Sequence, residues 1–150
     1  MDEIEKDLIK TLKKLGIGCI AFSPLAQGML SEKYLKTVPK KSRAAQNSSL
    51  SKKMITSSYK FKIHNLSKIA KKRNQTISQM AISWVLRHPT MTSALIGART
   101  LYQLNECLDS VKNLKFSNLE IKQINKFAKE KKLIYGKLRV STKLLIKFNI

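Results

Sequence analysis

The sequence predicts an α/β fold in which strands and helices alternate in the order βαβα. Two short apolar runs, residues 17–22 and 93–97, have the composition of buried strands. Apolar residues between and after these runs recur at the helical spacings of three and four. A hydrophobic fraction of 43% over 150 residues is enough for one domain with a modest core, and it argues against wholesale disorder.

The first helix is expected over residues 4–15, where Leu8 and Leu12 fall on one face, and Gly16 should end it. The strand over residues 17–22 is apolar throughout, which is typical of a strand covered on both faces.

The loop after this strand is the main candidate for a binding site. The strand ends abruptly in a Ser-Pro pair and a glycine follows; the residues are Ser23, Pro24, Leu25, Ala26, Gln27 and Gly28. At the carboxyl end of a parallel strand, backbone N–H groups and small side chains can meet the charged group of a ligand. The loop therefore predicts a cradle for a cofactor.

Residues 36–58 are rich in Lys and Ser without a helical stripe, which predicts a long loop that covers a ligand as a lid. Leu66 and Ile69 begin the next apolar helical face. Thr76 and Gln79 then have the spacing of a capping box at the start of another helix.

After Pro89 stops that helix, the strand over residues 93–97 is followed by a second capping box at Thr100 and Gln103. The helix it opens carries an apolar stripe on one face: Leu101, Leu104, Leu108 and Val111. Another helix should begin near Ser117.

The charge of the chain is strongly unbalanced, with 30 Lys and Arg against 9 Asp and Glu, a formal net charge of +21. Clustered cations displace counterions from phosphate, so a non-enzymatic basic protein that binds nucleic acid is one hypothesis. Only five of the cations are arginine, the residue suited to bidentate recognition. Because no nucleic-acid-binding module is recognisable, drift in an A+T-rich genome is the favoured explanation, and no specific nucleic-acid partner is expected.

Cys19 and Cys107 lack metal-ligand spacing, which predicts free thiols in a reducing compartment and no metal site. The sequence opens with acidic residues, and no stretch approaches the ~18 apolar residues of a membrane span. A cytoplasmic protein without a membrane partner is therefore expected.

Two blocks of this sequence resemble the aldo-keto reductases, especially the branch of potassium-channel β subunits and bacterial L-glyceraldehyde 3-phosphate reductases. The first block is the loop 23–28 with Lys33-Tyr34-Leu35 and Ser42-Arg43. The second is residues 92–98, followed by Gln103, Leu104 and Glu106, where that family carries its adenosine-binding segment. The resemblance covers roughly residues 5–130.

The resemblance implies a (β/α)8 TIM barrel, which typically needs ~250 residues. Residues 1–130 would then be the carboxyl-terminal βαβα portion of such a barrel, and residues 131–150 a divergent basic tail. The catalytic Asp, Tyr, Lys and His of the family would lie on amino-terminal strands that this chain lacks. No catalytic residue is assigned, because none of the tyrosines stands in the family's catalytic motif: Tyr34, Tyr59, Tyr102 and Tyr135.

The resemblance also implies an NADPH site. Residues 23–28 would hold the pyrophosphate, Lys33 and Arg43 would hold the cofactor by charge, and the second block would bind the adenosine side through Gly97, Arg99, Gln103 and Glu106. Two positions depart from the family, with Arg99 in place of a serine and Cys107 in place of an asparagine. Arg99 could bind a 2'-phosphate, whereas a thiol cannot make the paired amide hydrogen bonds that adenine accepts.

The expected function is therefore that of the cofactor-binding portion of an NADPH-dependent aldo-keto reductase, an enzyme that reduces aldehydes and ketones. Alone, the chain is expected to be inactive, and it would act on a small carbonyl substrate only when completed by a separately encoded amino-terminal half. Self-association through open strand edges and a remnant without activity are the alternatives.

Overall fold

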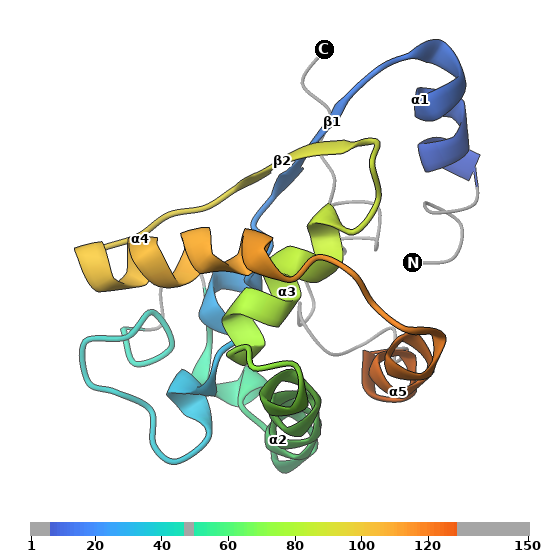
Figure 1. The fold of residues 1–150 in the computed structure, drawn as a ribbon. Helices are drawn as coiled ribbons and strands as arrows, with labels where there is room; N and C mark the ends of the chain where they lie inside the picture. The colour runs from blue at the N-terminus through green and yellow to red at the C-terminus, as the bar shows by residue number, and fades with distance from the viewer. Residues whose placement is uncertain (1–6, 47–49, 129–150) are drawn as a thin grey trace.

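The computed structural model describes residues 7–46 and 50–128, so the predicted basic tail lies outside the described part. Figure 1 shows the order of its elements, which is α1 (Ile9–Leu15), β1 (Cys19–Phe22), α2 (Ser57–Lys72), α3 (Ile77–Leu86), β2 (Met91–Leu95), α4 (Leu101–Leu108) and α5 (Asn118–Ala128). Single 3-10 turns lie between them, at Ala26–Gly28, Glu32–Tyr34, Lys52–Met54 and Asp109–Lys112. Among these helices, none is long and apolar enough to cross a membrane.

The two strands lie side by side and parallel, as the sequence predicted. Ile20 pairs with Ser93 and Phe22 with Leu95. The second strand begins and ends two residues before its expected bounds, and its pairing with β1 shifts register between Cys19 and Ile20. An α/β fold with a small parallel sheet is therefore confirmed.

Only one face of this sheet is covered within the described residues. Cys19, Ala21 and Met91 point to the covered face and form a small core with Leu12 of α1. On the opposite face, the open sheet face, three apolar side chains remain more than half exposed: Ile20 at 57%, Phe22 at 51% and Leu95 at 55%. The expectation that the first strand is covered on both faces is therefore wrong for the described part of the chain.

The apolar stripe predicted for the helix that begins after Thr100 is also exposed. The four residues of the stripe are 38% to 73% exposed: Leu101, Leu104, Leu108 and Val111. The helix instead contacts α3 through its other side, where Cys107 is buried. Helical periodicity identified the stripe correctly, but it carries no information about what covers the stripe.

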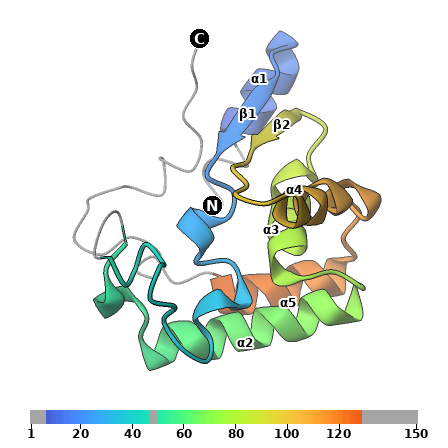
Figure 2. The ribbon, with the colours of Figure 1, turned by 90° about the vertical axis from the view of Figure 1, so that its left-hand side faces the viewer.

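The larger core lies among α2, α3 and α5. Figure 2 shows α2 and α5 lying side by side with α3 crossing next to them. The predicted loop over residues 36–58 is anchored in this core, because it buries Ala44 and Leu50. Helix α2 begins at Ser57, inside the predicted loop, with Thr56 as its N-cap.

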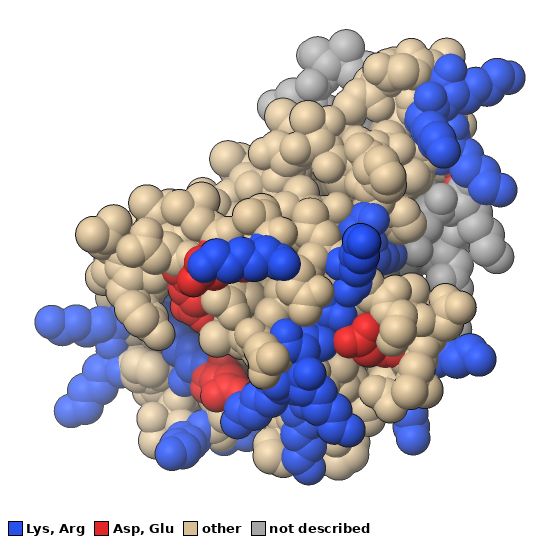
Figure 3. All heavy atoms as spheres, viewed as in Figure 1, with Lys and Arg blue, Asp and Glu red and all other residues tan. Residues whose placement is uncertain are grey.

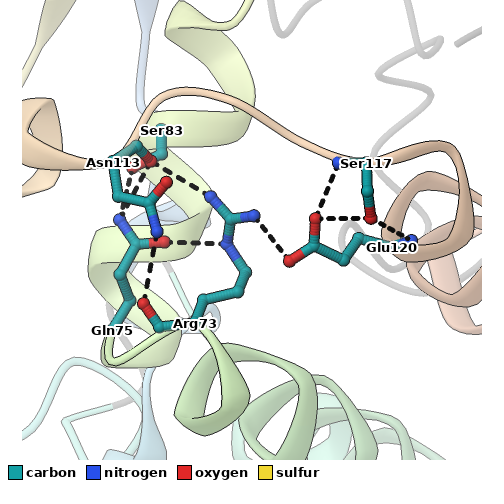
Figure 4. Close-up of polar contacts among 6 residues, drawn as sticks. All are labelled: Arg73, Gln75, Ser83, Asn113, Ser117 and Glu120. Carbon is teal, nitrogen blue, oxygen red and sulfur yellow. Dashed lines mark hydrogen bonds and ion pairs between the residues drawn. The ribbon is translucent and has the colours of Figure 1, made fainter.

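A buried arginine joins α2, α3 and α5, and Figure 4 shows its contacts. Arg73, whose side chain is 2% exposed, donates to Gln75 Oε1, to Asn113 O and to Glu120 Oε1 at 2.8 Å. Its guanidinium also lies over the Phe116 ring, 3.7 Å from the centroid.

Glu120 is fixed from the other side as well. Partial burial raises the pKa of Glu120, but hydrogen bonds from the Ser117 N–H and hydroxyl and the Arg73 guanidinium outweigh burial and hold this pKa below the ordinary value.

On the surface, Lys and Arg side chains spread over several elements in Figure 3, whereas the surface over β1 and β2 is tan and so lacks charged side chains on this face.

Candidate functional site

The loop that follows β1, residues 23–30, adopts a backbone conformation that most residues avoid. Ser23, Ala26 and Gln27 have positive φ angles of 55°, 47° and 59°, and Gly28 has a φ of 90°. A left-handed conformation costs a residue with a Cβ atom about 1–2 kcal/mol. Side chains at three such positions indicate that surrounding contacts impose the shape of this loop, which we call the β1 loop.

Short backbone hydrogen bonds close the β1 loop on itself. The Ala26 N–H donates to Ser23 O at 2.9 Å, and the Gly28 N–H donates to Leu25 O at 2.9 Å. Ala26 and Met29 are each 1% exposed and anchor the loop in the larger core, and Pro24 is also buried. The loop is thus a built structure at the carboxyl end of a parallel strand.

The cations that the sequence assigned to the cofactor converge in the fold. Lys33 follows the β1 loop, Arg43 lies in the long loop and Arg99 precedes α4. Burial lowers the pKa of Lys33, and the charges of Arg99 and Arg43 lower it further. Lys33 is therefore close enough to both arginines to be repelled by their charges, and a bound anion would relieve this repulsion; the three side chains are here called the cation cluster.

The side chains assigned to the adenosine end have partners within the protein. Gln103 Oε1 accepts a hydrogen bond from the Arg99 N–H at 2.9 Å, and Glu106 Oε1 accepts one from the Thr76 hydroxyl at 2.8 Å. The predicted capping box at Thr100 is therefore half formed: its hydroxyl accepts from the Gln103 N–H, but the glutamine reaches Arg99. These bonds fix the start of α4 next to Arg99.

Gly97 and Cys107 stand apart from this arrangement. Gly97 is exposed, and a Cβ atom there would meet nothing within 4 Å, so no close approach within the described chain requires a glycine. Cys107 is buried, and burial followed by the charge of Glu106 raises the pKa of its thiol. A protonated, buried thiol does not present a donor pair to an adenine ring.

The residues present fit a phosphate-bearing dinucleotide. The cation cluster supplies the charge that phosphate groups need, and Gln27 Oε1 in the β1 loop is buried without a hydrogen-bond partner among the described residues. A Cβ atom at Gly28 would meet nothing within 4 Å, so this glycine leaves open space at the loop. The Gln27 oxygen can accept a hydrogen bond from a ligand, the space at Gly28 leaves room for it, and the cation cluster can neutralise its phosphates.

No group of three or more His, Cys, Asp or Glu side chains that could hold a metal occurs among residues 7–46 and 50–128.

Tyr34 and Tyr59 are buried in the larger core, whereas Tyr102 is exposed, and Tyr135 lies outside the described residues. Sequence reasoning missed the contact of Tyr59 with the β1 loop, since nothing local links residues 30 positions apart.

Comparison with known proteins shows the family of this chain. The sequence pattern of the aldo/keto reductase family matches residues 1–129. The chain is 42% identical over 122 residues to L-glyceraldehyde 3-phosphate reductase of Escherichia coli strain K12, covering 79% of this chain and 35% of that protein. It is 41% identical over 122 residues to the protein of the same name from Escherichia coli O157:H7, with the same shares covered.

A more distant relative is the uncharacterized oxidoreductase YrpG of Bacillus subtilis, 31% identical over 107 residues, or 71% of this chain and 31% of that protein. The chain thus spans about a third of the length of the curated relatives it matches. With the match to the family pattern extending over most of the sequence, the chain belongs to the aldo/keto reductase family.

Proposed function

We propose that this chain is the NADPH-binding portion of an aldo-keto reductase, an oxidoreductase that acts on small carbonyl compounds. The observation that carries the proposal is that Arg43 and Arg99, from two separate segments, lie close enough to Lys33, which follows the β1 loop in the chain, for their charges to lower its pKa. NADPH differs from NADH by a 2'-phosphate, and an arginine fork is suited to hold that group.

In this proposal the chain binds and orients the cofactor. The β1 loop would hold the pyrophosphate, the cation cluster would neutralise the phosphates, and Gln103 would keep the Arg99 backbone in place. The cofactor would supply hydride for reduction of a carbonyl group. Two relatives carry L-glyceraldehyde 3-phosphate in their names, which supports a small aldehyde as the substrate class.

Completion by a second polypeptide is part of the proposal, and the exposed apolar surfaces support it. The open sheet face and the α4 stripe carry the kind of side chain that a barrel interior and its helix layer bury. The relatives contain about twice as much additional chain as this sequence matches. We propose that a separately encoded barrel portion covers these surfaces, and a second copy of this chain is the competing occupant. The proposed compartment is a reducing cytoplasm, which would keep Cys19 and Cys107 as thiols.

Removing the Arg99 guanidinium should lower the affinity for NADPH more than the affinity for NADH. In the 150-residue chain, Arg99→Ala is expected to weaken NADPH binding about tenfold or more while changing NADH binding little, because only NADPH carries the 2'-phosphate. Isothermal titration calorimetry with both cofactors measures the difference.

The matched control is Lys68→Ala, which removes one exposed cation from α2 and leaves the cation cluster intact. This variant should bind both cofactors as the unchanged chain does. Equal losses for NADPH and NADH in the Arg99 variant, or no binding of either cofactor by the unchanged chain, would contradict the proposed function.

Non-specific nucleic-acid binding is the second candidate, favoured by the net charge of +21. Affinity that rests on scattered lysines should be independent of sequence and should fall steeply between about 50 and 200 mM salt. Fluorescence anisotropy with two unrelated duplexes tests it. Retained binding at high salt, or discrimination between the duplexes, would contradict this non-specific contact and would indicate a dedicated nucleic-acid site instead.

A further inference from the structure

Three consecutive carbonyl groups of the β1 loop and its last turn each accept a hydrogen bond from a side-chain hydroxyl. The Ser31 hydroxyl donates to Gly28 O at 2.6 Å, the Tyr59 hydroxyl to Met29 O at 2.7 Å and the Ser78 hydroxyl to Leu30 O at 3.3 Å. We call these three donors the hydroxyl clamp. Two of them come from other elements, Tyr59 from α2 and Ser78 from α3.

Both distant donors are themselves held rigidly. Tyr59 is 2% exposed in the larger core, and its N–H donates to the Thr56 hydroxyl that caps α2. Burial, followed by the neighbouring Tyr34, raises the pKa of the Tyr59 phenol, so it stays protonated and can donate at neutral pH. Ser78 is buried in the first turn of α3, between the capping-box residues Thr76 and Gln79. The clamp therefore ties the loop to the starts of two helices.

The hydroxyl clamp bonds the part of the loop that directly follows its energetically unfavourable left-handed residues. Left-handed conformations at Ala26 and Gln27 lie directly before the three clamped carbonyls. A loop free to relax would leave these conformations, so the donors must oppose that relaxation. Once the Gly28, Met29 and Leu30 carbonyls are bonded inward, they cannot turn toward an anionic ligand.

We propose that Tyr59 and Ser78 are positioning residues that hold the β1 loop in its ligand-binding conformation before the cofactor arrives. This inference rests on the proposed function for the identity of the ligand, but the preorganised loop can be measured without it. Preorganisation raises affinity because the ordering of the loop is complete before binding. Both hydroxyls are engaged by carbonyls of the loop, so their role is to position the loop.

The test compares Tyr59→Phe and Ser78→Ala with Ser83→Ala in the full 150-residue chain. Ser83 is a matched control, because its buried hydroxyl also lies within hydrogen-bonding distance of backbone carbonyls, Gln79 O at 2.9 Å and Ser110 O at 2.7 Å, and can donate its one proton to either, away from the β1 loop. All three variants lose a buried hydroxyl, so each should lose some global stability. Only the first two should affect the loop.

Amide hydrogen exchange without cofactor gives the first readout. The Gly28, Met29 and Leu30 amides, which donate within the loop, should exchange about tenfold faster in the two clamp variants relative to amides of α5. NADPH titration gives the second, with affinity about tenfold weaker in the clamp variants and unchanged in Ser83→Ala.

Unchanged exchange of the loop amides in both clamp variants would overturn the inference, as would an equal effect from Ser83→Ala. Failure of the unchanged chain to bind NADPH would instead count against the proposed function. The exchange measurement would still decide whether the clamp orders the loop, so the two failures are distinguishable.

Discussion

Replacing Arg73 by methionine is expected to lower the free energy of unfolding by about 3 kcal/mol, a large part of the ~5–15 kcal/mol that holds a domain folded. The guanidinium donates to Gln75 Oε1, to the Asn113 carbonyl and to Glu120 Oε1. Its loss removes the ion pair with Glu120 and the hydrogen bond to buried Gln75, while Ser117 still donates to Glu120 and Gln75 still donates to the Asn113 carbonyl. Urea unfolding followed by circular dichroism measures the change.

Lys71→Met is the matched control, since Lys71 lies on the same helix with a side chain 75% exposed and 4.0 Å from Glu32. It should change stability by less than about 0.5 kcal/mol. A similar small effect from Arg73→Met would refute the structural role of the network.

The pH dependence gives an independent reading of the same network. Because the pKa of Glu120 is lowered in the fold, its contribution is complete above the unfolded value of about 4.3 and is lost as pH falls through the folded value. The stability gap between the unchanged chain and Arg73→Met should therefore narrow below about pH 4.

The chain alone is expected to show no NADPH-dependent reduction of small aldehydes above a buffer control. General acid catalysis typically contributes about 10²–10⁴-fold and needs a proton donor placed at the carbonyl. Tyr59, the phenol that contacts the β1 loop, is buried and donates its proton to Met29 O. Mixing the chain with the unmatched portion of the Escherichia coli relative should restore turnover, which absorbance at the nicotinamide band would follow.

Two matched substitutions show whether completion uses the open sheet face. Ile20→Lys places a charge on that face and should abolish the restored turnover, whereas Leu119→Lys, at an exposed apolar position of α5, should not. Turnover by the chain alone, or sedimentation as a homodimer that excludes the added portion, would refute this arrangement.

Local sequence signals predicted the helix boundaries well where a cap is made by neighbours. The capping box of Thr76 and Gln79 forms as expected, and Gly16 ends α1 with a φ of 67°. Parallel pairing of the two apolar runs was also predictable, because the helices between them provide a crossover.

The shape of the β1 loop was not predictable from local sequence. A glycine signals a positive φ, but Ser23, Ala26 and Gln27 carry no such signal. The loop is bonded at Met29 and Leu30 to side chains that lie far along the chain, Tyr59 and Ser78, and local sequence does not reveal such contacts. The exposure of the α4 stripe was also not predictable from local sequence, because periodicity predicts an apolar helix face without specifying what packs against it.

The central claim, that the β1 loop and the cation cluster form one NADPH site, is tested most directly by hydrogen–deuterium exchange of the full chain with and without saturating NADPH. Slower exchange is expected across residues 23–30 and at residues 99–103, which lead into α4, with little change in α5. Unchanged exchange at both segments, or slowing confined to α5, would contradict the claim.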